Sequence, residues 1–301
     1  MKAAQMHGYG GVDQLRYEDV PAPTAGPGEV LVKVAATSVN PIDWKIRRGD
    51  LKGMMTLQFP VILGRDVAGE VVAVGPGVSN FKPGQKVIAV ANRTYAEFVA
   101  VPSTALTLVP DGLDLDQAGV LPLVTTTGGE LIEYVRPNPG ETVLVTGAVG
   151  GVGRSAVYTA AQSGARVIAG VRERQKSAAA ALRADRVIAI DVDSEIGALP
   201  ELDSIADTVG GEVIGKLILK LKRGGALGSV LGKPKAAEGR DVHVETVRVE
   251  PNPGILAKLA EAVRTGELTI PVVKRLKLSE AADAQRLAEE RKVDGKIVIL
   301  P

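Results

Sequence analysis

A run of glycines gives the clearest chemical signal in the sequence. The stretch from Thr146 to Gly153 reads TGAVGGVG, directly after the apolar segment Thr142–Thr146 and directly before the helical pattern Val152–Gln162. Glycines between a strand and a helix permit a tight turn and a close approach of the backbone to a pyrophosphate, which the N–H groups of the helix N-terminus then bind. A turn that only packs the helix onto a sheet is the alternative, and the strict G-x-G-x-x-G spacing is absent. The strand–turn–helix context favours a dinucleotide site. The residues expected to contact the dinucleotide are Gly147, Ala148, Val149, Gly150, Gly151, Val152 and Gly153.

Three cations follow the next predicted strand, Arg166–Val171, at the place where a ribose would lie. They are Arg172, Arg174 and Lys176, with Glu173 between them. NAD-binding proteins place an acidic residue about 20 positions after the glycines, whereas a cationic cluster suits the 2′-phosphate of NADPH. The cluster therefore predicts NADPH. Glu173 keeps NADH open, and a solvated helix start is the alternative without a ligand.

These residues need a doubly wound sheet to hold them. From Thr142 onward the sequence alternates apolar strands with helices, which is typical of a parallel sheet covered on both faces. The predicted strands are Thr142–Thr146, Arg166–Val171, Arg186–Ile190, Ser204–Val209, Ala226–Leu231 and Val242–Val249. The predicted helices are Val152–Gln162, Arg174–Leu182, Val213–Leu221 and Ile255–Val263.

The first hundred residues have a different pattern. Short β-branched segments alternate with turns rich in Gly and Pro, which predicts a β-barrel-like domain. The expected strands are Val30–Val34, Val67–Val74, Lys86–Val90 and Tyr95–Val101. The final segment, Gly295–Leu300, is expected to be a strand that rejoins this first domain. The predicted fold class is thus α/β with two domains, residues 1–115 together with 267–301 and residues 116–266.

Composition limits the kinds of function. The chain has 301 residues, with 36 Lys and Arg against 35 Asp and Glu, two histidines and no cysteine. The absence of cysteine excludes disulfides, thiolate catalysis and cysteine-based zinc sites, and no metal is predicted. The balanced charge gives no footprint for nucleic acid or an anionic membrane. Uncharged stretches reach 13 residues, fewer than the ~20 of a spanning helix. With no apolar secretory segment at the N-terminus, a cytoplasmic location is expected.

The order and spacing of several motifs resemble those of the medium-chain dehydrogenase/reductase superfamily, in its zinc-free quinone oxidoreductase (zeta-crystallin-like) branch. The motifs are Tyr9-Gly10-Gly11, residues 27–32 (PGEVLV), residues 38–43 (SVNPID), residues 64–69 (GRDVAG), residues 121–123 (LPL), the glycine run, residues 206–211 (ADTVGG) and residues 295–298 (GKIV). The resemblance implies a GroES-like barrel domain plus a Rossmann domain, with NADPH in the cleft between them. Zinc-dependent relatives have a Gly-His-Glu motif where this chain has Gly64-Arg65-Asp66.

The resemblance also implies roles for individual residues. Asn40 is similar to an asparagine that faces the nicotinamide and the substrate, and Lys45 is expected near the nicotinamide ribose or an enolate that develops after hydride transfer. Thr127 corresponds to a threonine near the nicotinamide, against the alternative of helix N-capping. Asp66 is expected near the cofactor, with bracing of a turn as its alternative. Further cofactor contacts are expected at Val209, Gly210 and Leu231.

The expected activity is metal-free, NADPH-dependent hydride transfer to a quinone or an α,β-unsaturated carbonyl. An enoyl-thioester reductase is one alternative, and a non-catalytic NADPH-binding sensor or structural protein is another. Gly128-Gly129 stand where relatives often carry Ala and an aromatic residue, which suggests a differently walled pocket. The resemblance implies a homodimer through the edge strand Val242–Val249, with a small-molecule substrate and no nucleic-acid or membrane partner.

Overall fold

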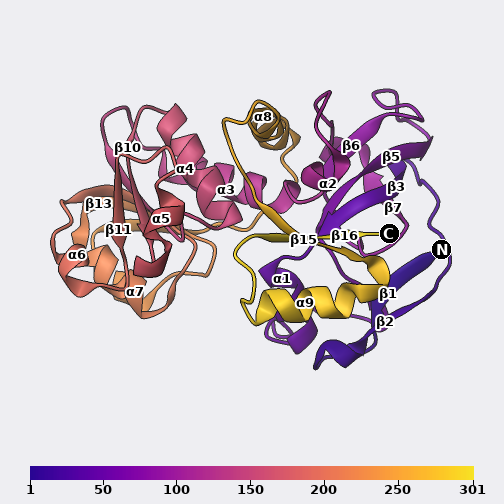
Figure 1. Cartoon of the computed structure of the whole chain (residues 1–301), viewed down its shortest axis with the longest axis horizontal. Coiled ribbons are helices and arrows are strands. Elements are labelled where there is room, and N and C mark those ends of the chain that lie inside the picture. The colour runs from indigo at the N-terminus through magenta and orange to yellow at the C-terminus, as the bar shows by residue number, and fades with distance from the viewer. The chain divides into compact units, whose positions relative to one another are not determined.

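The computed structural model describes all 301 residues and divides into two compact units (Figure 1). Unit 1 comprises Met1–Leu123 and Glu250–Pro301, and unit 2 comprises Val124–Val249. The division falls at 123/124 and 249/250, compared with 115/116 and 266/267 expected from the sequence. Helix α8 (Pro253–Arg264) accounts for the second difference, because it packs against strand β8 (Leu106–Leu108) of unit 1. No helix is long and apolar enough to cross a membrane.

Unit 1 is built around a seven-stranded sheet of order β15-β16-β3-β5-β6-β8, in which β7 also pairs with β3. Its centre is the ten-residue strand β3, whose inward-facing valines pack against those of β5, β6 and β7 in one apolar core. A second sheet has the order β2-β1-β4. The strands are β1 (Lys2–Met6), β2 (Leu15–Asp19), β3 (Glu29–Ser38), β4 (Val61–Ile62), β5 (Asp66–Val74), β6 (Lys86–Val90), β7 (Phe98–Pro102), β8, β15 (Val272–Lys277) and β16 (Lys296–Leu300), and the helices besides α8 are α1 (Pro41–Arg48), α2 (Leu115–Ala118) and α9 (Ala281–Glu289).

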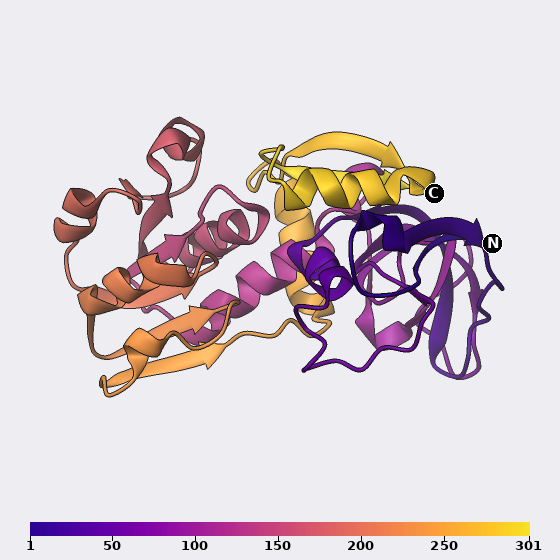
Figure 2. The same ribbon diagram turned by 90° about the horizontal axis from the view of Figure 1, so that it is seen from below.

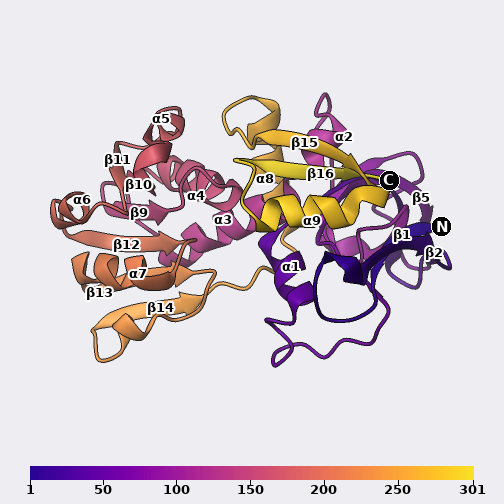
Figure 3. The same cartoon turned by 60° about the horizontal axis from the view of Figure 1, so that its bottom comes forward.

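The last strand joins the two ends of the sequence within unit 1. Strand β16 pairs antiparallel with β3, where Val298 lies opposite Ser38 and Ile299 opposite Thr37. Figure 2 shows the C-terminal segment lying beside the N-terminal strands, and Figure 3 shows α9 alongside β15 and β16. The predicted return of this strand to the first domain is confirmed, and it brings Lys296 to the end of β3.

Unit 2 is a doubly wound sheet of six parallel strands in the order β11-β10-β9-β12-β13-β14. The order reverses between β9 and β12, and β14 forms one outer edge (Figure 3). Apolar side chains fill both faces of the sheet in two separate cores. The strands are β9 (Thr142–Thr146), β10 (Arg166–Val171), β11 (Arg186–Ala189), β12 (Leu202–Asp207), β13 (Leu221–Ser229) and β14 (Val242–Thr246), and the helices are α4 (Gly151–Gln162), α5 (Lys176–Ala179), α6 (Asp193–Gly197) and α7 (Gly211–Leu217), with α3 (Pro122–Val135) entering from unit 1.

Helix α3 corrects two interpretations of the sequence. Thr127 is buried inside α3, well after its first residue Pro122, so helix N-capping is not its role. At Gly128 a Cβ would lie 2.5 Å from the Cβ of Ser155 and 2.6 Å from the carbonyl oxygen of Val152. Gly128 therefore permits α3 and α4 to pack closely, so its missing side chain serves helix packing and does not indicate a differently walled pocket.

Candidate functional site

The sheet of unit 2 has its topological switch point between β9 and β12, where doubly wound sheets bind ligands at the carboxyl ends of their strands. One buried carboxylate organises this edge. Asp207, at the end of β12, is 1% exposed. Its Oδ1 accepts hydrogen bonds from the Thr146 hydroxyl (2.8 Å), the Val209 amide (3.1 Å) and the Gly210 amide (3.0 Å). Its Oδ2 accepts from the Ser229 hydroxyl (2.8 Å), so the ends of β9, β12 and β13 are tied to one side chain.

The glycine run forms the turn that the sequence predicts between β9 and α4. Gly147 has a φ of +62°, and a Cβ there would lie 2.4 Å from Oγ1 of Thr208. At Gly153 a Cβ would lie 2.2 Å from the carbonyl oxygen of Gly147. Only glycine fits at either position. The resulting turn places the free N–H groups of the first residues of α4 at the same edge as Asp207, and no acidic residue lies in that first turn.

Two exposed apolar side chains flank the same edge. Val209 follows β12 and is 42% exposed, and Leu231 follows β13 and is 45% exposed. Gly210 lies between them with a φ of +64°, and a Cβ there would lie 2.7 Å from Cδ1 of Leu231. Apolar side chains beside a polar turn suit the flat, partly apolar surface of a dinucleotide. The structure thus brings Val209, Gly210 and Leu231 together with the glycine turn.

The three predicted cations follow β10, but they differ in their surroundings. Arg172 is exposed, and its side chain makes no hydrogen bond or ion pair. Arg174 is also exposed. Lys176 is partly buried and forms an ion pair with Glu195, which also accepts a hydrogen bond from the Ala189 amide (2.8 Å). Arg172 is therefore the cation best able to receive a 2′-phosphate without first losing a partner.

A second buried carboxylate organises unit 1. Asp66, at the start of β5, is fully buried, and its Oδ1 accepts a hydrogen bond from the Leu123 amide (2.6 Å). Its Oδ2 accepts from Asn40 Nδ2 (2.7 Å) and from the Ser38 hydroxyl. Nζ of Lys296 lies 3.6 Å from the same oxygen.

Asn40 and Lys296 complete this group, which we call the Asp66 cluster: Ser38, Asn40, Asp66 and Lys296. Nζ of Lys296 donates to Oδ1 of Asn40 (2.6 Å) and to the carbonyl oxygen of Val39 (2.9 Å). Burial lowers the pKa of Lys296, while Asp66 acts in the opposite direction. Asn40 is 0% exposed, and both ends of its amide are engaged. The arrangement suits a residue that positions the start of α1.

Asp43 is a third buried carboxylate, on the first turn of α1. Its Oδ2 accepts from the Asn40 amide (2.8 Å) and from the Tyr95 hydroxyl (2.9 Å), whereas its Oδ1 is buried without a partner. Burial raises the pKa of Asp43 to about 7, against the lowering effect of its two donors. Burial of the Tyr95 hydroxyl, and after it the Asp43 carboxylate, raise the pKa of Tyr95. Asp43 therefore changes its charge near neutral pH, next to the Asp66 cluster.

Two partly buried cations of unit 1 have charged nitrogens without a partner. Lys45, on α1, is partly buried and makes no hydrogen bond or ion pair. Arg65, directly before Asp66, has a buried Nε without a partner. A cation without a counter-ion is free to bind an anionic group of a ligand. Lys45 is the predicted site residue of unit 1 with this property.

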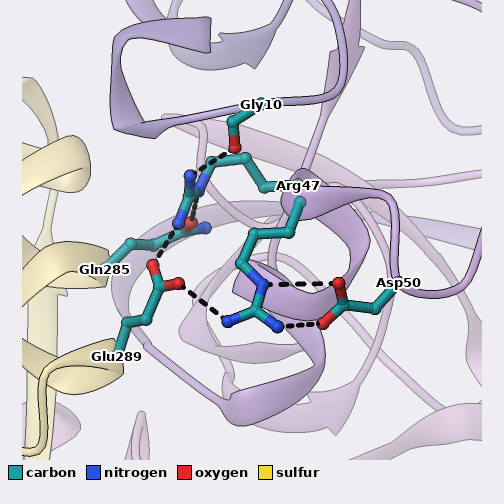
Figure 4. Close-up of polar contacts among 6 residues, drawn as sticks. Gly10, Arg47, Asp50, Gln285 and Glu289 are labelled. Atoms are coloured by element: carbon teal, nitrogen blue, oxygen red, sulfur yellow. Dashed lines mark hydrogen bonds and ion pairs between the residues drawn. The ribbon is translucent and has the colours of Figure 1, made fainter.

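Arg47 has a structural environment. It is 1% exposed, and its guanidinium donates to Gln285 Oε1 (2.8 Å), to the Gly10 carbonyl oxygen (2.7 Å) and to Glu289 (Figure 4). Arg48 is about half exposed, and its Nη1 lies 3.2 Å from Oε1 of Glu289. Its Nε and Nη2 donate to the two carboxylate oxygens of Asp50. These contacts attach α1 to α9 within unit 1.

Comparisons with known proteins match both halves of the chain. The profile of the Alcohol dehydrogenase GroES-like domain family matches residues 26–111, and that of the Zinc-binding dehydrogenase family matches residues 182–299. A chloroplast envelope quinone oxidoreductase homolog from Arabidopsis thaliana is 30% identical, over 100% of this chain and 98% of the relative. An NADPH-dependent alkenal/one oxidoreductase of the same plant is 32% identical, over 100% of this chain and 80% of its own.

Solved structures agree. The quinone oxidoreductase of Coxiella burnetii superposes with a TM-score of 0.89 at 30% identity, covering 100% of this chain and 99% of the other. The chain belongs to the medium-chain dehydrogenase/reductase superfamily, in its quinone oxidoreductase-like family. The family predicted from the sequence is confirmed, as are the GroES-like and Rossmann-like folds of the two units. The chain is an oxidoreductase of this family.

A zinc ion, which the second family's description implies, does not fit the residues of this chain. The chain has no cysteine, and Arg65 stands in the place of the histidine of the Gly-His-Glu motif. Asp66 is already bound by Lys296, Ser38 and Asn40. We find no group of three or more His, Cys, Asp or Glu side chains that would hold a metal.

Three residues escaped the sequence analysis as organisers of the site: Asp207, Thr146 and Ser229. Each ends a parallel strand, and the carboxyl ends of neighbouring strands meet at one edge. Their places at the carboxyl ends of predicted parallel strands are the sequence feature from which these residues could have been predicted.

Proposed function

We propose that the chain is an NADPH-dependent reductase of quinones or α,β-unsaturated carbonyls. The observation that carries the proposal is the glycine turn at the switch point of unit 2, held by Asp207 and opening onto the first turn of α4. When bound there, a reduced nicotinamide cofactor supplies a hydride. The names of two relatives support the substrate class: an alkenal/one oxidoreductase and a 2-methylene-furan-3-one reductase.

The residues of unit 2 provide binding. The N–H groups at the start of α4 and the positive end of its dipole favour phosphate, and the glycine turn lets phosphate approach the backbone. Arg172 is the cation we assign to a 2′-phosphate, with Arg174 and Lys176 as secondary contributors. These cations support a preference for NADPH over NADH, because only NADPH carries the 2′-phosphate.

The residues of unit 1 that we assign to the reaction are Lys45 and Asn40, in different roles. Lys45 has no counter-ion, so it is able to stabilise negative charge on a substrate oxygen as the hydride arrives. Asn40 is buried and engaged by Asp66 and Lys296, so we assign it the positioning of α1 and hence of Lys45.

Titration of the purified chain with NADPH and with NADH, followed by nicotinamide oxidation at 340 nm with a quinone and with an enone, tests the proposal. We expect tighter binding of NADPH and turnover of at least one substrate class. Lys45→Ala should lower kcat about 10–100-fold with NADPH affinity retained, while Lys52→Ala, an exposed lysine just beyond α1, should change neither. NADPH binding without any turnover would instead support the sensor alternative.

We also propose a homodimer that pairs β14 of two copies. Strand β14 pairs only with β13, and its other edge is open. His243 and Glu245 are exposed on it. A dimer by light scattering that Val244→Pro converts to a monomer would support this pairing, and a monomeric wild type would exclude it. The cytoplasmic location remains a prediction for cell fractionation.

A further inference from the structure

Arg154 is a cation of unit 2 that the proposed cofactor contacts do not include. It is the fourth residue of α4, and its Nε donates to the carbonyl oxygen of Val149 (2.9 Å). Val149 lies in the glycine turn, five residues earlier. The guanidinium is therefore held against the turn that begins the candidate dinucleotide site.

This guanidinium is partly buried and has no counter-ion. No carboxylate pairs with it, and burial alone lowers the pKa of Arg154. Lys176, another partly buried cation of unit 2, is paired with Glu195, and Nζ of Lys220 donates to the carbonyl oxygens of Gly197 and Leu199. Partial burial of an unpaired charge costs free energy, which an anionic ligand would recover.

The surroundings favour a phosphate as that ligand. The first turn of α4 contains no acidic residue, and its N–H groups and dipole attract negative charge. The terminal nitrogens of an arginine match two phosphate oxygens at once. Because Nε is fixed by Val149, these nitrogens are the part of the side chain left for a ligand.

We propose that Arg154 is a phosphate ligand of the bound dinucleotide. This inference rests on the proposed nucleotide binding, and deepens it by naming a contact that the glycine turn and Arg172 do not supply. Two phosphates carry the same chemistry: the pyrophosphate shared by NADH and NADPH, and the 2′-phosphate of NADPH alone.

Dissociation constants of NADPH and NADH for the full chain and for Arg154→Met, measured by calorimetry without any substrate, test this assignment. We expect at least a tenfold weaker affinity in the variant. An equal loss for both nucleotides identifies the pyrophosphate, and a loss confined to NADPH identifies the 2′-phosphate. Arg154→Lys keeps the charge and should retain part of the affinity.

Arg166→Met is the matched control. Arg166 also donates from Nε to a backbone carbonyl, that of Gly140 (3.0 Å), but it lies at the amino end of β10. Its replacement should leave both affinities unchanged. Unchanged affinities in a folded Arg154→Met would overturn the assignment and leave the proposed function intact, and a lower melting temperature alone would show that Arg154 only braces the turn. A wild-type chain that binds neither nucleotide would overturn both.

Discussion

Each unit contains a buried aspartate at a strand end, and the two are neutralised in different ways. Asp66 in unit 1 has an ion-pair partner, Nζ of Lys296, 3.6 Å away and 230 positions later in the sequence. Asp207 in unit 2 accepts only from neutral hydroxyls and amides at the ends of β9, β12 and β13. The first arrangement joins the two ends of the chain, whereas the second fixes the shape of the sheet edge that forms the candidate site.

The largest loss of stability is expected when the lysine that pairs with Asp66 is replaced. Lys296→Met would leave the carboxylate of Asp66 buried without a counter-ion, so the free energy of unfolding should fall by about 3–5 kcal/mol. Urea denaturation of the full chain measures this. The double variant Lys296→Met/Asp66→Asn removes both charges and should recover a large part of the loss. If it recovers none, the pair is not the source of the effect.

Asp43 extends the comparison, because it is a buried carboxylate with fewer hydrogen-bond donors than Asp66 or Asp207. Its pKa is about 7 when folded, and its ordinary value is 3.8. The folded state therefore holds the proton more tightly, so the contribution is complete below pH 4 and is lost as the pH rises through 7. Asp43→Asn should remove this pH dependence of the free energy of unfolding, which amounts to roughly 4 kcal/mol as an upper limit.

Urea denaturation of Asp43→Asn and of the wild type between pH 4 and pH 8 is the measurement. The two proteins should be similar at pH 4, and the variant should be the more stable at pH 8. Parallel pH profiles would show that Asp43 is charged in the folded state throughout this range.

Arg47 and Arg48 offer a paired test of long-range attachment in unit 1. Both donate to Glu289, but Arg47 is buried and Arg48 is about half exposed. Arg47→Met should cost about 3 kcal/mol, because it leaves Gln285 Oε1 and the Gly10 carbonyl without their donor and removes the buried partner of Glu289. Arg48→Met should cost less than about 1 kcal/mol, as exposed pairs do. Similar melting temperatures for the two variants would contradict the assignment.

In unit 2 the expected loss of stability is smaller than for Lys296→Met or Arg47→Met, and it is accompanied by a loss of binding. Asp207→Ala should lower the free energy of unfolding by about 2 kcal/mol and weaken NADPH affinity, because the turn at Val209 and Gly210 loses its acceptor. Asp203→Ala is the control at the opposite end of β12. Asp203 accepts from the Thr142 amide (2.7 Å), away from the candidate site. Calorimetric titration with NADPH should separate the two variants.

Regular elements were predictable from the sequence where one physical signal dominates. The segments Thr142–Thr146 and Arg166–Val171 are strands with the predicted bounds, because each is an apolar run ended by glycine or charge. The predicted helix Arg174–Leu182 contains α5 of only four residues, Lys176–Ala179, after a short 3-10 turn. Most side chains of this segment are small and most are exposed, so they bury too little apolar surface to stabilise a longer helix.

The candidate site was predictable in its glycines and less so in its polar side chains. The turn from Gly147 to Gly153 follows from local geometry that only glycine permits. The partners of Asn40, by contrast, are Asp66 and Lys296, which pairing of β16 with β3 brings together. No local pattern encodes such a contact.

The position of Lys296 bears on the order in which the chain is synthesised. The strands of unit 2 and the partners of Asp207 lie between Val124 and Val249, so that unit has all of its sequence while the chain is still being translated. Unit 1 lacks β16 and the cation of its central cluster until residues 296–300, which follow all of unit 2, have been synthesised. Unit 2 is therefore able to fold first, and unit 1, which carries Lys45, completes its core later.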